Sequence, residues 1–371
     1  MAKTAAVLHC TLDASSFQGG RMDDESLALY LRGCDWLYSD AFGAEGPALF
    51  RKVVEREPGF APGWAKYALV TEAVGKGYPP DQAAVAMVQA RAAAEKALQL
   101  DPRQGLAYAA LADMTPPQHL WEQQALLQKG LSVAPDNADL DYVESDLLVR
   151  VGRQHDALAY AQRAASLDPL QFNYFLSLST CLAIEGRVAE ARGVIERAMA
   201  AWPGNGDVLQ GQIAFEARWG DPDRAVMLLD DPKSRPAGME SAQADDWRQF
   251  ALARKSHDPK VAAAYARGIL TQVASGGMDP DRALIRLNSL GATDAAFTVA
   301  AQANPEALDT EGLFRSAPGG TPMWRDPRFL PLAGRLGLVG FWRRSGLWPD
   351  FCEAPDRPYD CRAETARLHL D

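Results

Sequence analysis

The residues able to do acid–base, metal or nucleophilic chemistry are scattered along this sequence. No two of its five histidines have the i, i+4 spacing by which one helix face binds zinc. No glycine-rich phosphate loop, Gly-x-Ser-x-Gly nucleophile turn or paired-carboxylate motif is present. We therefore expect no catalytic residue, no metal site and no cofactor, and we predict that the protein is not an enzyme. The histidines are His9, His119, His155, His257 and His369.

Composition and charge also exclude some classes of function. The 371 residues carry a net charge of −10, with 47% hydrophobic and 23% charged residues, which is ordinary for a folded chain. Neutralising nucleic-acid phosphates needs clustered Lys and Arg, so we expect no nucleic-acid binding by this chain itself. The sequence has no run of about 18 apolar residues, so we expect no membrane span. Because Met1-Ala2-Lys3 does not begin a secretory signal, the expected location is the cytoplasm.

The elements that must position any binding residues are set by one pattern that occurs twice between residues 138 and 203. A glycine ends a helix cheaply because it adopts the left-handed conformation. Alanines two turns apart let two helices approach closely, and a proline stops the second helix. The pattern predicts helix pairs that must stack to bury their apolar faces. Its landmarks, 34 residues apart, are Gly152 and Gly186, Ala157 and Ala191, Ala164 and Ala198, and Pro169 and Pro203.

This period and these landmarks resemble the tetratricopeptide repeat, or TPR. The resemblance implies an all-α fold, a TPR-like right-handed α-solenoid, in which the repeated alanines are nearly inaccessible. It also implies that the first helix of each pair lines a concave face, with its second, fifth, ninth and thirteenth side chains pointing toward a protein or peptide partner. The expected partner-binding residues are Asp35, Asp113, Tyr142, Asp146, Arg150, Asn173, Thr180, Gln210 and Arg218.

The charge of these positions predicts which segments the groove accepts. The ninth position is aspartate in three units, at Asp35, Asp113 and Asp146, so the first half of the groove is expected to be acidic. Chaperone-binding members of the family use Lys and Asn there to clamp a terminal carboxylate, and those residues are missing here. We predict that the protein is not a carboxylate clamp and prefers a basic or neutral segment. The alternative is that these are solvated carboxylates on an acidic protein.

The quality of the repeats varies along the chain. We expect a lead segment over residues 1–25, with a short helix over 5–12, then a TPR array over 26–232. Degenerate helical repeats follow over 233–311, and a C-terminal capping tail over 312–371. The unit that closes at Pro102 is about ten residues longer than the period, and we expect the excess in a loop over 75–81. Gly46 stands where alanine is usual.

Aromatic residues are concentrated in the tail. Solenoid ends expose an apolar face, and large aromatic rings have the area to cover it, which predicts a C-terminal aromatic cap. The expected capping residues are Phe329, Phe341, Trp342, Trp348 and Phe351.

Together with Tyr30-Leu31-Arg32-Gly33 near the start, this tail resembles the one that closes the TPR region of bacterial membrane-anchored winged-helix transcription activators and class III adenylate cyclases. Two functions follow as expectations. One is a non-catalytic TPR scaffold that mediates protein–protein interaction through its concave face. The other is a sensory or regulatory segment of a signalling or transcription-regulatory protein whose effector domain is absent from this chain. The second function would place the chain in the periplasmic region of a larger membrane-anchored protein.

Cys352 and Cys361, nine residues apart, match cysteines in those tails. The match implies a disulfide if the tail lies in an oxidising compartment, whereas both would stay thiols in the cytoplasm. Cys10, Cys34 and Cys181 lie in apolar helical contexts, and we expect them to be small core residues.

If the repeated alanines lie at helix interfaces, enlarging one must overpack the core. We expect Ala191→Trp to lower the free energy of unfolding by about 1–3 kcal/mol, measured by urea denaturation. A variant that unfolds with the parent would show that the alanines do not lie between helices.

Overall fold

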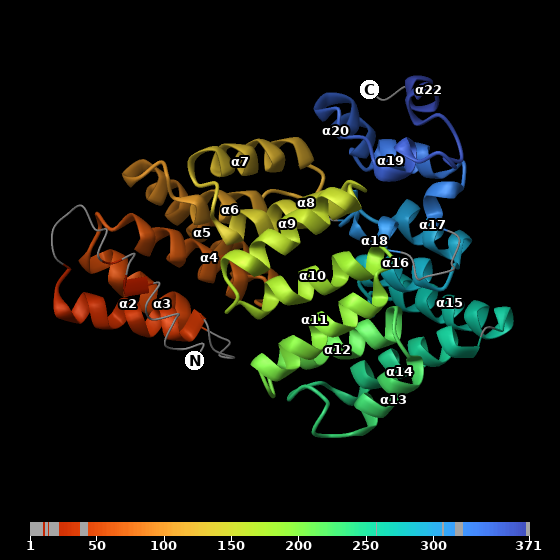
Figure 1. Cartoon of the computed structure of the whole chain (residues 1–371), viewed down its shortest axis with the longest axis horizontal. Coiled ribbons are helices and arrows are strands. Elements are labelled where there is room, and N and C mark those ends of the chain that lie inside the picture. The colour runs from red at the N-terminus through yellow and green to blue at the C-terminus, as the bar shows by residue number, and fades with distance from the viewer. Residues whose placement is uncertain are drawn as a thin grey trace. The chain divides into compact units, whose positions relative to one another are not determined.

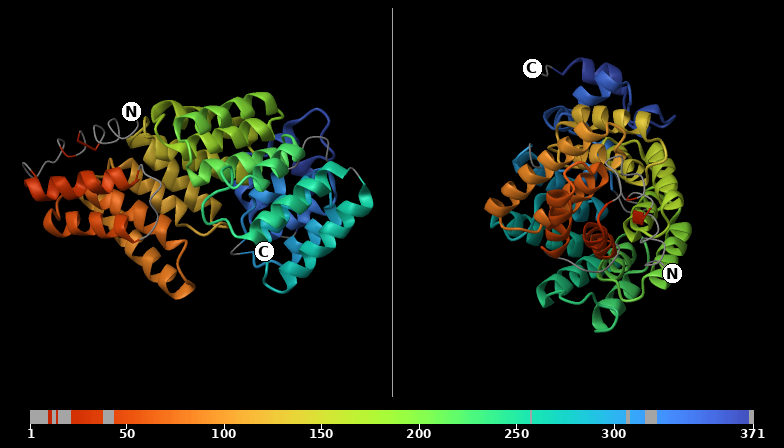
Figure 2. Two further views of the ribbon diagram at one scale, coloured as in Figure 1. Left: turned by 90° about the horizontal axis from the view of Figure 1, so that it is seen from below. Right: turned by 90° about the vertical axis from the view of Figure 1, so that its left-hand side faces the viewer.

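The computed structural model describes residues 10–11, 14, 22–37, 44–256, 258–305, 308–315 and 322–368. Within these ranges the chain forms helices joined by turns, and no strand occurs among them (Figures 1 and 2). The expected all-α solenoid is confirmed. The short helix expected over 5–12 falls largely outside the described residues, as do Gly319-Gly320 and three histidines, His9, His257 and His369.

Helices follow one another with short connections along the described chain, as stacked helix pairs require. In chain order they are α2 (Asp24–Leu37), α3 (Glu45–Arg56), α4 (Ala61–Gly75), α5 (Pro80–Leu100), α6 (Gly105–Asp113), α7 (Leu120–Val133), α8 (Ala138–Arg150), α9 (Gln154–Leu167), α10 (Phe172–Ile184), α11 (Val188–Ala201), α12 (Gly206–Arg218), α13 (Pro222–Asp230), α14 (Ser241–Ser256), α15 (Pro259–Ala274), α16 (Pro280–Ser289), α17 (Thr293–Gln302), α18 (Glu311–Phe314), the 3₁₀ helix η1 (Met323–Arg325), α19 (Phe329–Arg335), α20 (Leu338–Ser345), α21 (Asp350–Glu353) and α22 (Cys361–Ala366).

The chain divides into two compact units. Unit 1 is Met1–Thr115, Glu122–Glu144 and Arg163–Gln171, and unit 2 is Pro116–Trp121, Ser145–Gln162 and Phe172–Asp371. In unit 1, α4 packs against α3, α5 and α6. In unit 2, α12 packs against α10, α11, α13 and α14, so the first helices of successive pairs touch, as in stacked repeats. The boundaries predicted near residues 26, 233 and 312 concern repeat quality and stay predictions.

The two glycine landmarks end their helices as predicted, and Gly220 and Gly291 follow the ends of two later first helices, α12 and α16. Gly152, Gly186 and Gly291 have φ values of +83°, +77° and +66°, the region that glycine adopts without strain. Gly220 is not among the glycines with positive φ. A side chain there would instead collide with the Glu216 carboxylate, whose Oε2 lies 2.1 Å from the Cβ position. Gly220 is therefore required by close packing rather than by backbone conformation.

The alanines of the pattern are closed to solvent, which confirms the predicted helix interfaces. A hydrogen bond repeats with the same period. Ser145 Oγ donates to the Ala157 carbonyl at 2.9 Å, and Ser179 Oγ donates to the Ala191 carbonyl at 3.1 Å. The four alanines, each with 0% exposure, are Ala157, Ala164, Ala191 and Ala198.

Two irregularities of the first repeats have structural causes. A Cβ at Gly46 would lie 2.4 Å from the Trp36 ring, so the usual alanine does not fit beside this tryptophan. The prediction that the extra residues before Pro102 form a loop over 75–81 was wrong. The connection is only 76–79, and most of the excess extends α5 to 21 residues, whereas α9 and α11 have 14 each. Alanine-rich sequence favours this extension because alanine has the highest helix propensity.

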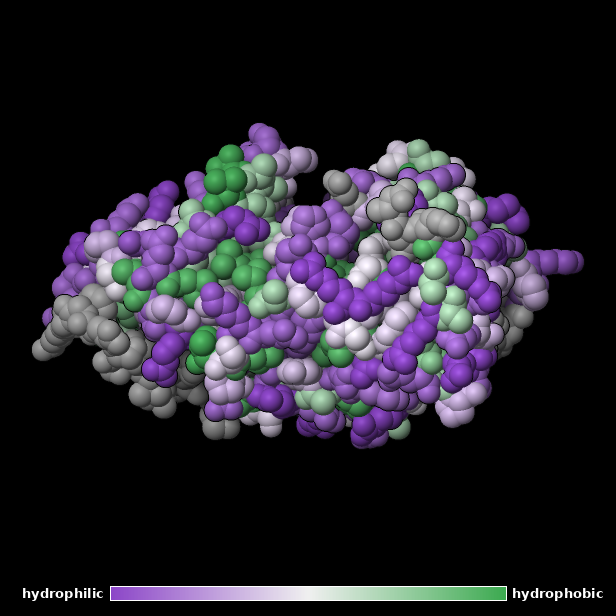
Figure 3. Space-filling view, turned by 90° about the horizontal axis from the view of Figure 1, so that it is seen from above, coloured by the Kyte–Doolittle hydropathy of each residue, from purple (hydrophilic) through white to green (hydrophobic). Residues whose placement is uncertain are grey.

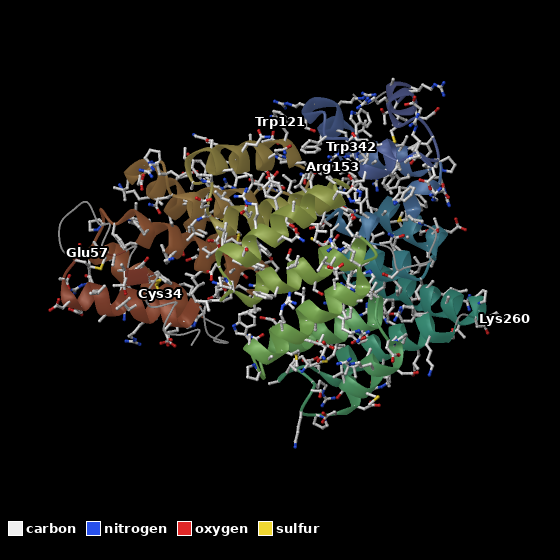
Figure 4. The ribbon with its side chains drawn as sticks, viewed as in Figure 1. Cys34, Glu57, Trp121, Arg153, Lys260 and Trp342 are labelled. Carbon is white, nitrogen blue, oxygen red and sulfur yellow. A yellow bond between two sulfur atoms is a disulfide. The ribbon has the colours of Figure 1, made fainter. Side chains whose placement is uncertain are left out.

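Unit 1 has an aromatic core held beside a disulfide. The Tyr30 ring packs edge-on against Phe50 and Phe60, with centroids 5.9 Å and 5.0 Å away. Cys10 is bonded to Cys34 of α2 (Figure 4), and both are fully buried. Both cysteines lie in the core as predicted, but the disulfide between them was not predicted, since a sequence spacing of 24 residues gave no sign of their contact.

In unit 2 the tail packs against the turn that follows α8. The last carbonyls of a helix lack partners within it, and three successive carbonyls here accept hydrogen bonds from the tail. Thr310 Oγ1 donates to Arg150 O at 2.7 Å, Trp342 Nε1 to Val151 O at 2.9 Å, and the Asp350 amide to Gly152 O at 2.9 Å. This turn, residues 150–153, is thus completed by residues roughly 160 to 200 positions later.

Arg153 extends the same contact from the turn outward (Figure 4). Its Nη1 donates to the Trp348 carbonyl and to the Glu353 carboxylate, both at 2.9 Å. The aromatic residues predicted to form the cap are buried, at 0–7% exposure. A disulfide joins Cys352 to Cys361, the pairing that the resemblance implied, and Cys181 is a free buried thiol.

Hydrophilic residues cover most of the face shown in Figure 3, with smaller groups of hydrophobic residues between them. Large exposed apolar side chains include Val85, Val88 and Met227, at 57%, 71% and 70% exposure. Within the described ranges, no helix has the length and hydrophobicity needed to cross a bilayer.

Gly152 contacts the tail and the equivalent Gly186 does not, so substituting each in turn measures how much the tail contact contributes to stability. A Cβ at Gly152 would lie 2.7 Å from both Phe314 and Pro349, whereas one at Gly186 meets nothing within 4 Å. We expect Gly186→Ala to cost about 1–2 kcal/mol from backbone strain alone. Gly152→Ala should cost about 1–3 kcal/mol more because it also overpacks the tail contact. Equal losses in urea denaturation would contradict this packing.

Candidate functional site

The nine predicted partner-binding residues fall in both units. Asp35 of α2, Asp113 of α6 and Tyr142 of α8 belong to unit 1. The others belong to unit 2 and lie on α8, α10 and α12; they are Asp146, Arg150, Asn173, Thr180, Gln210 and Arg218.

In unit 1, Asp113 belongs to a three-residue charge cluster. Lys76 Nζ lies 2.8 Å from Asp113 Oδ2 and also pairs with the carboxylate of Glu72. Glu72 is 2% exposed. Burial and, to a smaller extent, the negative charge of Asp113 raise the pKa of Glu72 to about 7, although Lys76 opposes the change. The cluster offers a partner less negative charge than the sequence suggested, since one lysine faces both carboxylates.

In unit 2, Asp146 is also paired. Its Oδ2 lies 3.0 Å from Arg150 Nε, one turn further along α8. Arg150 is 6% exposed, and its carbonyl accepts the hydrogen bond from Thr310. Little of the Arg150 side chain is therefore accessible to a partner. Two of the three aspartates predicted to make the groove acidic therefore have a cation beside them.

The remaining four predicted residues lie together in unit 2. Asn173 and Thr180 of α10 and Gln210 and Arg218 of α12 line one cavity of about 310 Å³. The alternate turns of two neighbouring first helices place them along the same face. Asn173 and Gln210 are exposed, whereas Thr180 and Arg218 are partly buried. The repeat pattern thus predicted a set of side chains that the fold brings together.

Aromatic rings form one wall of this cavity. Phe215, Trp219 and Trp247 line it. The Arg218 guanidinium carbon lies 5.8 Å from the centroid of Trp219 and 5.4 Å from that of Trp247, which are cation–π distances. Trp219 follows Arg218 directly in the sequence, but Trp247 comes from α14, and no repeat landmark marks it. Sequence reasoning missed both.

A larger hollow of about 1370 Å³ in unit 2 lies beside the α12–α13 turn and α15. Two pairs of charged residues in its lining neutralise each other. Lys255 Nζ is 2.5 Å from Asp223, and Arg328 is 2.7 Å from Asp326. The smaller cavity differs because the guanidinium of Arg218 in its lining lies against two indole rings.

One group of possible metal ligands lies beside the docked tail. His155, Glu185 and Asp350 each offer an atom within 4.8 Å of the others, from three separate segments. His155 Nδ1 is 2.6 Å from Glu185 Oε2, and the His155 amide donates to Asp350 Oδ2 at 3.1 Å. Arg153 Nη1 also lies 3.8 Å from Asp350 Oδ1, and a guanidinium at that distance repels a dication. We assign these residues to tail docking.

Among the described residues, the lining of the cavity between α10 and α12 does not contain a nucleophile paired with a base. Its one serine, Ser179, donates its hydroxyl hydrogen to the Ala191 carbonyl. Amide, hydroxyl and guanidinium groups beside aromatic rings are the mixture by which proteins recognise extended polar ligands.

No protein-family model matches the sequence, and no curated protein sequence matches it. Several solved structures of helical-repeat proteins are similar to the chain. YrrB, described as a TPR protein with an unusual peptide-binding site, is 24% identical, with 53% of this chain and 95% of that chain covered and a TM-score of 0.34. PilW, a type IV pilus biogenesis factor, is 21% identical, with 63% and 91% covered and a TM-score of 0.33. Yeast Tom70 is 14% identical, with 99% and 73% covered and a TM-score of 0.42.

The Glu72 cluster makes stability depend on pH. The pKa of Glu72 is about 7 in the folded chain and 4.5 ordinarily, so the folded state holds the proton more tightly. The stability that results is fully present below pH 4.5 and is lost as pH rises through 7. We expect Glu72→Gln to remove this loss and to be more stable than the parent near pH 8, by up to about 3 kcal/mol.

Urea denaturation across this pH range measures the difference. Glu95→Gln, at an exposed position of α5, is the matched control and should leave the parent's pH dependence unchanged. A Glu72→Gln variant that keeps the parent's loss of stability between pH 4.5 and 7 would show that another group causes it.

Proposed function

We propose that this chain is a non-catalytic scaffold that binds a segment of a partner protein on the first helices of its stacked pairs. The observation that carries the proposal is the cavity of unit 2, which gathers four of the residues selected by repeat position alone. The cavity is lined by both α10 and α12, so a segment lying across successive pairs would contact it. Its volume of about 310 Å³ suits a few residues of an extended chain rather than a folded domain.

The polar residues of this cavity are available for such a ligand. Asn173, Thr180 and Gln210 make no side-chain hydrogen bond within the described part of the chain. Amide side chains both donate and accept, so they can pair with the backbone of an extended segment whatever its sequence. The cavity could therefore hold a peptide through its backbone.

Site-specific photocrosslinking tests the proposal. A benzophenone amino acid at Gln210 lies in the cavity, whereas the same group at Arg197 lies at an exposed position of the second helix α11. In a lysate of the source cells, we expect a discrete crosslinked partner at Gln210, enriched about tenfold over Arg197. Equal crosslinking at both positions would show that this surface is not the binding face.

A regulatory segment of a bacterial signalling protein is the second candidate, and the disulfides favour it. Cys10–Cys34 and Cys352–Cys361 are both bonded, and disulfides persist mainly in oxidising compartments such as the periplasm. The proposed location is then the periplasmic region of a membrane-anchored protein rather than the cytoplasm. Alkylation of the natively produced, denatured and unreduced chain should label Cys181 alone, and labelling of all five cysteines would contradict it.

A further inference from the structure

Arg218 differs from its neighbours because its charge has no counterion. No ion pair or hydrogen bond of its side chain occurs in the described part of the chain. Its Nε is buried and lacks a hydrogen-bond partner. Its contacts are the faces of Trp219 and Trp247. Leaving a buried donor unpaired is unfavourable, and leaving a buried cation unpaired costs more.

Three other arginines around this cavity have an anionic partner. Arg286 lies over the same Trp247 ring, at 4.5 Å, but pairs with Asp246 at 2.8 Å. Arg192 of α11, which lies over the Phe215 ring, contacts the carboxylate of Glu216. Arg315 pairs with Glu311. These arginines are satisfied within the chain, and Arg218 is the one that faces the cavity without a carboxylate.

The surroundings of Arg218 favour an anion. Burial and, to a smaller extent, the positive charges of Arg315, Arg286 and Arg282 lower the pKa of the Arg218 guanidinium to about 9. The same field that disfavours a proton on Arg218 attracts a negative group placed beside it. A carboxylate there could form charge-assisted hydrogen bonds with the guanidinium while the two indole rings hold the guanidinium in place.

The two ends of the cavity carry different charged residues. Asp207 lines it at the start of α12 and Arg218 at the end, about 16 Å apart along the helix axis. A carboxylate near Arg218 would be attracted to its guanidinium. Gln210 follows Asp207 by three residues on α12, and Asn173 has on α10 the repeat position equivalent to that of Asp207. Both amides can pair with the backbone of a segment that runs along α12.

We propose, on the basis of the proposed scaffold function, that this cavity binds an extended segment of a partner protein with an aspartate or glutamate carboxylate on the Arg218 guanidinium. The ligand of unit 2 is therefore acidic at this point, in contrast to the basic or neutral segment that the repeat positions suggested. The occupant is a protein side chain rather than a free small anion because the amides of Asn173 and Gln210 line the same cavity away from Arg218, where a chain that continues past the carboxylate would lie.

Binding of short labelled peptides to the full chain tests this. The probes are fluorescein-labelled hexaglutamate, hexaglutamine and hexalysine, all C-terminally amidated, and the readout is fluorescence anisotropy in about 150 mM salt, where long-range fields are screened. Because the protein carries a charge of −10, general attraction favours hexalysine. We expect hexaglutamate to bind at least about tenfold more tightly than hexaglutamine.

Variants locate the binding. Arg218→Gln should weaken hexaglutamate binding at least about tenfold, Arg218→Lys less, and the exposed control Arg197→Gln not at all. The Arg218→Gln chain should melt no lower than the parent because it removes an unpaired cation. A lower melting temperature would assign Arg218 a structural role and overturn the proposal.

Further outcomes separate this proposal from the scaffold function. If hexaglutamate fails to bind, or binds Arg218→Gln as well as the parent, while crosslinking at Gln210 persists, the acidic ligand is wrong and the groove stands. If crosslinking at Gln210 is also no stronger than at Arg197, both proposals fail. If inorganic phosphate alone displaces hexaglutamate at micromolar concentration, the site accepts a small anion and the protein ligand is overturned.

Discussion

The whole fold depends on how closely two helices can approach within each pair. At Ala157, Ala164, Ala191 and Ala198 there is no room for a larger side chain, and solvent is excluded completely. Such contacts bury little area apiece, so a pair is stable only when its outer surfaces are covered by the next pair. Ser145 and Ser179 each hydrogen-bond to the alanine-bearing helix across this gap. The short distance between paired helices thus allows hydrogen bonds between them as well as apolar contacts.

Where packing repeats, the sequence predicts the structure well, and where it does not repeat, prediction fails for identifiable reasons. The spacing of glycine and alanine predicted the helix pairs and the left-handed residue at Gly152 and Gly186 because both are local requirements. The length of α5 was missed, since an alanine-rich stretch can extend a helix as easily as it can end one. The Cys10–Cys34 bond was missed because contact between a lead segment and a helix leaves no periodic signal.

The candidate site shows the same division. Repeat position selected Asn173, Thr180, Gln210 and Arg218, which do share a cavity. It could not show that Asp113 and Asp146 are each paired with a cation, since Lys76 comes from another helix pair and the effect of Arg150 depends on its rotamer. It also could not supply Trp247, which lies on α14 beyond the regular repeats. The net charge around a residue of the concave face therefore depends on several helices, and the sequence of one helix does not determine it.

The docking of the tail changes the order in which parts of unit 2 can be completed. Contacts within stacked pairs are local and can form as the chain is made, whereas those of the α8–α9 turn join residues about 195 positions apart, as between Arg153 and Trp348. Closing so long a loop is slow compared with helix pairing. During synthesis at roughly 5–20 residues per second, the carbonyls of Arg150, Val151 and Gly152 stay open to water for tens of seconds. During this time, the carbonyls of this turn are accessible to other chains.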